Sequence, residues 1–212
     1  NLGMIQGGTR TLINTLARSG PLGSGGHYDA SAEYLVPLGF SGEYQVEVIT
    51  DADNALNDKE RADNTLDRTL SITLADYADL TVTGIDAPEQ LIDDPATLNV
   101  SWTVKNNGTG VGRTSAWDDR VILSTDAILG NSDDRVLGNY RYDDGPLAAG
   151  ASYTHNASIV LAPGSTARYT LFVVSDARND VFENGAKANN VGRLAHALDV
   201  MPIPYADLQV TA

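Results

Sequence analysis

Cysteine is absent from the 212-residue chain, and basic residues are few. Without cysteine there is no disulfide framework, no thiolate metal site and no cysteine nucleophile. Only 14 Lys and Arg stand against 28 Asp and Glu, which gives a net charge of −14. Nucleic-acid binding requires a basic stripe, and anionic membrane surfaces repel an acidic chain. We therefore expect neither nucleic acid nor a membrane surface as a partner.

Long hydrophobic runs and an obvious leader are also missing. No apolar run approaches the roughly 18–20 residues that a membrane span requires, so we expect no membrane insertion. No signal peptide is visible, and the chain begins at Asn1 rather than Met, which suggests a fragment or a processed product. Two Met, two Trp and 20 Gly are typical of a turn-rich β protein rather than a helical bundle.

The sequence repeats itself. Four pairs share an offset of 125 residues (169 − 44 = 125): Tyr44 and Tyr169, Asp51 and Asp176, Asn54 and Asn179, Asn64 and Asn189. Tyr77–Thr83 matches Tyr205–Thr211 at an offset of 128 (205 − 77 = 128). This pattern predicts three segments: the later part of a first repeat at 1–77, a complete repeat at 78–204, and the start of a third at 205–212.

Strand signals dominate both copies. Residues 97–105 alternate apolar and polar side chains, which is the period of a half-buried strand. Further strands are expected at 78–85, 121–123, 155–161, 169–174 and 191–200, and in the first copy at 31–36, 44–50 and 66–74. We therefore predict an all-β protein built of tandem immunoglobulin-like antiparallel β-sandwiches, of which the first is incomplete.

Several motifs of the complete copy occur together in a known family. They are Ala78-Asp79-Leu80-Thr81-Val82, Trp102-Thr103-Val104-Lys105-Asn106-Asn107-Gly108, the run from Trp117 to Asp126, and Asn189-Asn190. This succession resembles the CARDB family, the cell-adhesion-related domains of bacterial surface and secreted proteins. The resemblance implies an immunoglobulin-like sandwich in a long extracellular protein, often with calcium. In the first copy Thr65 stands where the second Asn of the terminal pair is expected.

Two matching acidic loops are the main candidate calcium sites. Calcium takes six to eight oxygen ligands, mostly from carboxylates, amide side chains and backbone carbonyls. The second loop offers Asp176, Asn179, Asp180, Glu183, Asn189 and Asn190; the first offers Asp51, Asn54, Asp58 and Asn64. The alternative interpretation is a long hairpin in which Asp and Asn side chains make turns and caps.

A weaker calcium candidate follows the strand at 121–123. Its oxygen donors are Asp126, Asp133 and Asp134. The corresponding part of the first copy, residues 1–10, lacks these carboxylates, so a solvated acidic turn is the alternative.

Catalysis is not expected. The carboxylate pairs at Asp93-Asp94, Asp118-Asp119 and Asp143-Asp144 are sequence neighbours, and neighbours on a strand point to opposite faces. We interpret them as solvated turn residues. The three His residues have no metal-ligand spacing, and no nucleophile–base set is visible.

The favoured hypothesis is a non-catalytic, calcium-stabilised extracellular repeat that acts as a spacer or adhesive segment. Its partners would be neighbouring repeats of the same chain, and a surface protein or glycan. One alternative is a glycan- or protein-binding accessory domain of a secreted hydrolase, with an aromatic platform of Trp117 and Tyr140 or Tyr142. Another is a subunit of an extracellular filament or surface layer, in which residues 205–210 add a strand to a neighbour by β-augmentation.

Overall fold

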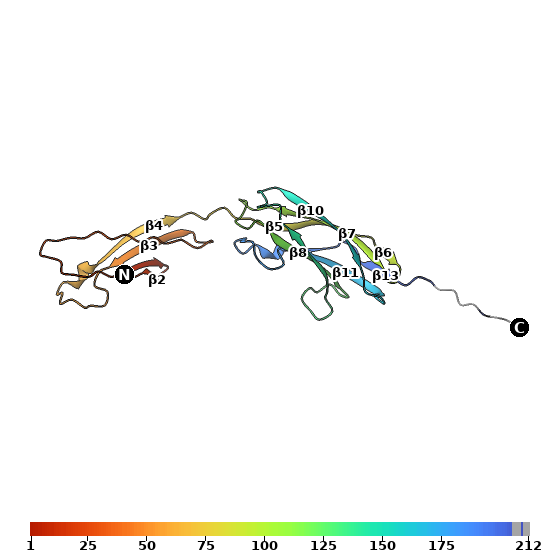
Figure 1. The fold of residues 1–212 in the computed structure, drawn as a ribbon, viewed down its shortest axis with the longest axis horizontal. Coiled ribbons are helices and arrows are strands. Elements are labelled where there is room, and N and C mark those ends of the chain that lie inside the picture. Colours follow the sequence, from red (N-terminus) through yellow and green to blue (C-terminus); the bar gives the residue numbers. More distant parts are fainter. Residues whose placement is uncertain (205–208, 210–212) are drawn as a thin grey trace. The chain divides into compact units, whose positions relative to one another are not determined.

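The computed structural model of the chain describes residues 1–204 and 209. The chain divides into two compact units, Asn1–Ala75 and Asp76–Ala212, and its regular elements are strands apart from two short 3-10 helices (Figure 1). The predicted start of a third repeat at 205–212 lies, apart from residue 209, outside the described residues. No helix in the described part of the chain is long and apolar enough to cross a membrane.

The N-terminal unit is a single four-stranded antiparallel sheet in the order β2-β1-β3-β4. Its elements are β1 (Leu2–Gln6), β2 (Thr9–Asn14), β3 (Gly42–Ile49), the 3-10 helix η1 (Arg61–Asn64) and β4 (Thr65–Ile72). The β1–β2 hairpin turns through Gly7 and Gly8, whose φ values of 56° and 82° suit the two-residue turn that matches strand twist.

The prediction of a strand at 31–36 is wrong, because these residues have no regular secondary structure. Its counterpart in the C-terminal unit is β10 (Ser152–Val160), which is held along its whole length by β7 (Thr97–Asn106). Residues 1–75 are all described and contain no counterpart of β7. The segment 31–36 therefore has no strand to pair with.

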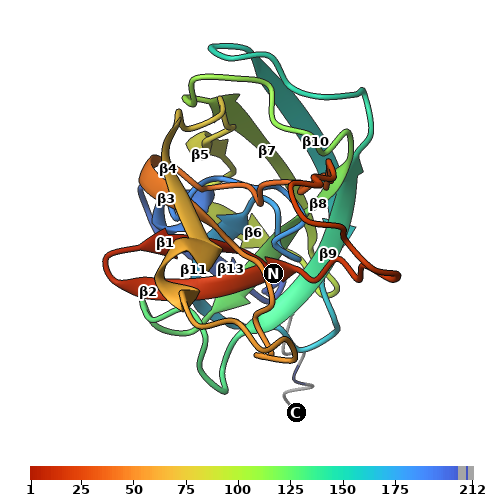
Figure 2. The same cartoon turned by 90° about the vertical axis from the view of Figure 1, so that its left-hand side faces the viewer.

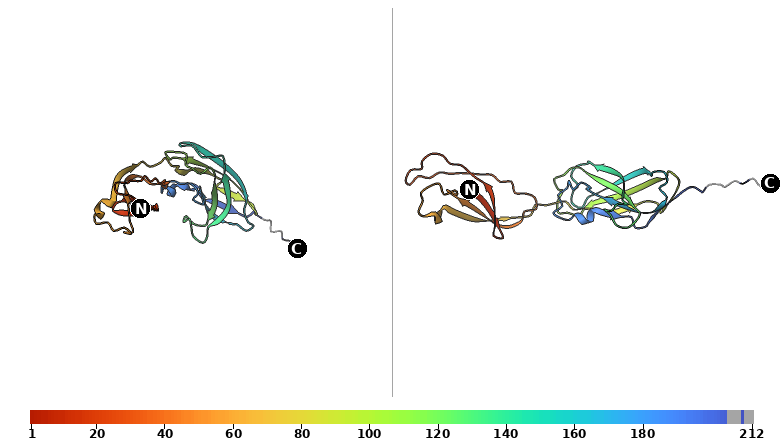
Figure 3. Two further views of the ribbon diagram at one scale, coloured as in Figure 1. Left: turned by 60° about the vertical axis from the view of Figure 1, so that its left-hand side comes forward. Right: turned by 90° about the horizontal axis from the view of Figure 1, so that it is seen from below.

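The C-terminal unit has two sheets that enclose one core (Figure 3). One sheet has the order β10-β7-β5, with β5 at Leu80–Asp86. The other has the order β6-β13-β11-β8-β9, and β12 also pairs with β11. Its strands are β6 (Gln90–Ile92), β8 (Trp117–Ser124), β9 (Arg135–Tyr142), β11 (Ala167–Val174), β12 (Val191–Arg193) and β13 (Leu198–Met201).

The core confirms the alternation predicted for residues 97–105. Leu98, Val100, Trp102 and Val104 on β7 are at most 3% exposed, and the intervening residues are not buried. They form one hydrophobic cluster with Tyr169, Leu171 and Val173 of β11 in the second sheet. The predicted strand at 191–200 is in fact two strands, because β12 and β13 pair with opposite ends of β11. The all-β sandwich fold is thus confirmed.

Candidate functional site

The loop that follows β11 is organised by the carboxylate of Asp176. Asp176 has a φ of 48°, a left-handed conformation that Asp and Asn adopt more readily than other non-glycine residues. Its two oxygens accept the backbone N–H groups of Asp180 at 2.8 Å and Val181 at 3.1 Å. Ser175 closes the loop by donating its N–H to the carbonyl of Asn190. The sequence of the loop therefore caps its own backbone.

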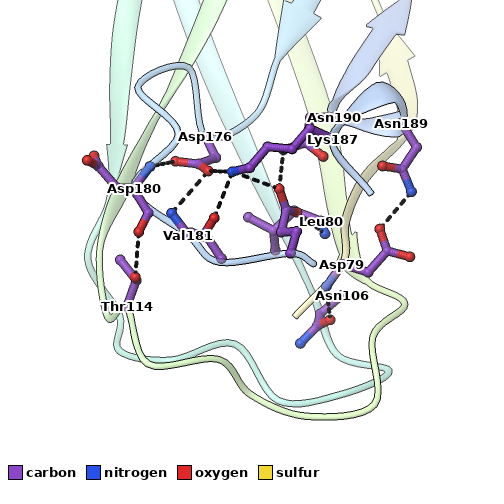
Figure 4. A network of polar contacts seen from close by, with 11 residues as sticks. Asp79, Leu80, Asn106, Thr114, Asp176, Asp180, Val181, Lys187, Asn189 and Asn190 are labelled. Carbon is purple, nitrogen blue, oxygen red and sulfur yellow. Dashed lines mark hydrogen bonds and ion pairs between the residues drawn. The ribbon is translucent and has the colours of Figure 1, made fainter. Parts of the chain in front are cut away.

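Lys187 places a cation at the centre of this loop (Figure 4). Its Nζ lies 2.7 Å from Asp176 Oδ2, 3.1 Å from Glu183 Oε2 and 2.7 Å from the carbonyl oxygen of Val181. Burial alone would lower the pKa of Lys187, but the hydrogen bonds to the two carboxylates outweigh it and raise the pKa. Three acceptors thus satisfy the three donors of one ammonium group.

Glu183 joins this loop to the first strand of the same unit. Its side chain is buried; Oε1 accepts the N–H of Leu80 at 2.5 Å, and Oε2 accepts Nδ2 of Asn190 at 2.8 Å. Asn189 adds bonds from Nδ2 to Asp79 Oδ1 at 2.7 Å and to Thr81 Oγ1 at 3.0 Å. The loop therefore fastens the start of β5, more than 100 residues away in sequence.

The first acidic loop repeats part of this bonding pattern with an arginine. Asp51 accepts the N–H groups of Ala55 and Leu56, and Arg61 Nη1 lies 2.9 Å from Asp51 Oδ2. Arg61 also donates to Asn54 Oδ1 at 2.6 Å and to the carbonyl of Leu56. Burial alone would raise the pKa of Asp51. The hydrogen bond from Arg61, together with those from the backbone N–H groups of Leu56 and Ala55, lowers this pKa instead.

These bonds correct the alignment of the two loops. Thr50 donates its N–H to the carbonyl of Asn64, as Ser175 does to Asn190, so these Asn residues correspond at an offset of 126 (190 − 64 = 126). The pairing of Asn64 with Asn189, and the interpretation that Thr65 replaces the second Asn, are therefore wrong. The second loop has one residue more, which also aligns Arg61 with Lys187.

The predicted ligands converge only in part. Asp176 and Glu183 meet at Lys187, and Asn190 contacts Glu183. Asp180 bonds through its backbone, and Asn179 forms a left-handed turn. Asp58 accepts the nearby N–H of Glu60 and forms no ion pair with Arg61 in the described structure. Among the described residues, no three His, Asp or Glu side chains are grouped as metal ligands. Calcium in these loops remains a prediction, and Lys187 and Arg61 already supply positive charge there.

The loop from Ser124 to Asp134 is different, because no described basic side chain forms an ion pair with its carboxylates. Hydrogen bonds from Thr125 and Ser124 lower the pKa of Asp133 to about 2. Asp126 accepts the N–H of Ile128 at 2.7 Å and Nδ2 of Asn131 at 3.0 Å. Asp134 Oδ1 is buried and has no partner among the described residues.

A buried polar network in the core was not predicted from the sequence. Asp119 is fully buried; Oδ2 accepts Nε1 of Trp102 at 2.7 Å, and both oxygens lie within 2.9 Å of the Tyr153 hydroxyl. Burial raises the pKa of Asp119, and burial with the nearby Asp119 charge raises that of Tyr153. The interpretation of Asp118-Asp119 as solvated turn residues is wrong, because both lie on β8 and are at most 6% exposed.

The proposed aromatic platform does not exist on the described surface. Trp117 and Tyr142 are buried and stack at a centroid distance of 4.3 Å, and Tyr140 packs edge-on against Trp102 at 5.1 Å. Both Trp residues are core residues, since the strands that carry them turn these positions inward. The alternating pattern of β7 was the available signal for Trp102.

Comparisons with known proteins place these features in context. The family model described as CARDB matches residues 77–193. The chain is similar to a crystal structure of the CARDB domain of a Pyrococcus furiosus protein, described as in complex with di-metal ions: identity is 22%, coverage 62% of this chain and 100% of that chain, and the TM-score 0.44. A solution NMR structure of a CARDB domain from the same organism shows 23% identity, coverage of 60% and 98%, and a TM-score of 0.43. No curated protein matches the chain.

Proposed function

The chain belongs to the CARDB family, and we propose that it serves as a non-catalytic spacer or adhesive segment of a larger extracellular protein. Membership of this family supports a non-catalytic β domain. The role of this chain is argued from how its polar residues are used. In the described part of the chain, the best-organised polar groups hold strands and loops together rather than face an open cleft.

One observation carries the proposal: the contacts around Lys187 link the loop 176–190, and through Glu183 the start of β5, into one bonded unit. The same loop chemistry around Arg61 supports the view that both units are copies of one module. Loops that are closed by their own cations make rigid modules, and rigid modules suit a spacer.

The extracellular role is tested on the organism that makes the protein. Antibodies raised against residues 76–204 should label intact cells or the culture medium, and protease added to intact cells should remove the cell-bound signal. Labelling that appears only after permeabilisation would contradict the proposal.

Calcium stabilisation is a second proposal, carried by the uncompensated carboxylates of the loop from Ser124 to Asp134 and by the unpartnered oxygen of Asp134. Asp126, Asp133 and Asp134 are not grouped as metal ligands in this structure, so the ion would have to draw their carboxylates together; its charge would offset their mutual repulsion. Binding to the native state alone stabilises it by about 2.7 kcal/mol at 100 times the Kd.

The test is a thermal melt followed by tryptophan fluorescence, since both Trp residues are in the C-terminal unit. Millimolar calcium should raise Tm, a chelator should reverse the rise, and Asp134→Asn should reduce it. If calcium instead binds between Asp176 and Glu183, Lys187→Met should enlarge the rise and Asp134→Asn should leave it unchanged. Equal melting curves with and without calcium would exclude both sites.

A surface protein or glycan as partner stays a prediction. So does strand exchange through residues 205–210, most of which lie outside the described residues.

A further inference from the structure

Strand β10 forms an open edge of the C-terminal unit. It is the last strand of the β10-β7-β5 sheet, as Figure 2 shows, and it runs for nine residues without a register shift against β7. Its alternate residues Ser152, Thr154, Asn156, Ser158 and Val160 are all exposed. An edge of this length displays a row of backbone donors and acceptors.

The direction of these backbone groups follows from the ends of the strand. Ala151 accepts from Asn106, and Leu161 donates to Ala96, so the odd-numbered residues turn their N–H and C=O groups toward β7. Antiparallel pairing alternates, so the even-numbered residues from Ser152 to Val160 turn theirs away from the sheet. No described residue bonds to these outward groups.

The composition of β10 sets it apart from the other edges. Proteins protect exposed edge strands with charged residues, Pro or bulges. Every other described edge strand longer than three residues has a charge: Arg10 in β2, Asp67 and Arg68 in β4, Asp86 in β5, and Arg135 and Arg141 in β9. Strand β10 has no Lys, Arg, Asp, Glu or Pro, and its one His is on an odd-numbered position.

We propose that β10 is a homotypic interaction edge, where two copies of this chain pair antiparallel about a two-fold axis at Asn156. Asn156 then faces Asn156 of the second copy, Thr154 faces Ser158, and Ser152 faces Val160. Each facing pair exchanges two backbone bonds, for a total of about ten. The result is a continuous six-stranded sheet, β5-β7-β10 followed by its two-fold mate.

The uncharged and self-complementary pattern of this edge points to a second copy of the chain as its occupant. Two chains of net charge −14 repel each other over most of their surfaces. The pairing about Asn156 brings together only uncharged side chains, so it places no like charges opposite each other. The pattern is also self-complementary, which an isologous two-fold interface requires. This pairing does not depend on the calcium proposal.

Cysteine substitution tests the predicted register in the full chain, which has no other thiol. Hydrogen-bonded antiparallel partners have Cα atoms about 5.5 Å apart, within disulfide range. Asn156→Cys should therefore form a covalent dimer on mild oxidation. Thr154→Cys is the matched control, because its copies lie roughly 13 Å apart along the strand. The yield for Asn156→Cys should exceed that control at least about tenfold, and mixing Thr154→Cys with Ser158→Cys should restore cross-linking.

Charge substitution tests whether this edge drives association without a covalent bond. Analytical ultracentrifugation should show that the wild-type chain dimerises reversibly. Because an interface made by one edge strand is small and binds weakly, dimers are expected at protein concentrations up to roughly 1 mM. Asn156→Lys alone and Asn156→Glu alone should remain monomeric, and their equal mixture should dimerise. A wild-type chain that stays monomeric, equal cross-linking at positions 154 and 156, or a dimer that Asn156→Lys does not weaken would each overturn the proposal. A monomer that captures only extended peptides of other proteins falls under the first of these outcomes.

Discussion

At the scale of single residues, Lys187 decides the electrostatics of a loop that has the composition of a calcium site. Asp176 and Glu183 have fully buried side chains, and each would be an unpaired buried charge without the ammonium group between them. Arg61 has the equivalent place beside Asp51. Neither residue was included among the predicted ligands, because a metal interpretation counts oxygen donors and ignores nearby bases.

Lys187→Met should lower the free energy of unfolding of the C-terminal unit by about 1–3 kcal/mol, a range discounted for the partial exposure of Lys187. Because the folded pKa of Lys187 is raised above the ordinary 10.5, its contribution is complete below pH 10.5 and declines as pH rises through the folded pKa. The difference between wild type and variant should thus shrink in strong alkali. Urea titrations followed by tryptophan fluorescence measure it, and Lys105→Met, which removes a lysine without a described ion pair, is the control.

Asp119 gives a pH dependence of the same sign in a lower pH range. Burial raises its folded pKa above 3.8, so the folded state holds its proton more tightly, and stability declines as pH rises through that folded pKa. Asp119→Asn keeps an acceptor for Trp102 and should remove this decline. Asp119→Leu leaves the Trp102 and Tyr153 donors without their acceptor and should cost roughly 2–4 kcal/mol. Unfolding curves between pH 4 and pH 8 compare the two variants; a parallel pH dependence in wild type and Asp119→Asn would contradict the account.

At the scale of elements, the sequence predicts strands wherever one face is buried. Residues 97–105 alternate strictly, and Thr97–Asn106 is a strand. The segment 31–36 shows why the pattern is insufficient, since a strand also needs a neighbour to pair with. Loop geometry was less predictable: the extra residue of the second loop lies where no apolar period marks the register. The burial of Asp119 could not be predicted, because two adjacent Asp residues are typical of a turn although here they lie on strand β8.

Glu183 connects two elements, and its removal should loosen both. Glu183→Ala removes the acceptor of the Leu80 N–H and the partner of Asn190. We expect faster amide hydrogen exchange at Leu80 and across η2 (Lys187–Asn190), with little change in β8. Glu183→Gln keeps an acceptor for Leu80 and should protect that amide more than Ala does. Unchanged exchange at Leu80 in Glu183→Ala would show that Glu183 does not hold β5.

At the scale of the whole molecule, net charge governs association. The chain has 28 acidic and 14 basic residues, while the β10 edge is uncharged. Salt screens repulsion between two like-charged chains, and it has no ion pair to weaken at this edge. Raising sodium chloride from low to physiological concentration should therefore lower the dimer dissociation constant. Sedimentation at several salt concentrations measures this, and a constant that rises with salt would indicate an interface held by ion pairs instead.

The central claim is that each unit closes its acidic loop with its own cation. Amide hydrogen exchange of the full chain, read for both units in one experiment, tests it most directly. Arg61→Met should accelerate exchange in residues 50–64 alone, and Lys187→Met in residues 175–190 and at Leu80 alone. If neither substitution changes exchange in its own loop, the loops are held together by something other than Arg61 and Lys187, and the claim is wrong.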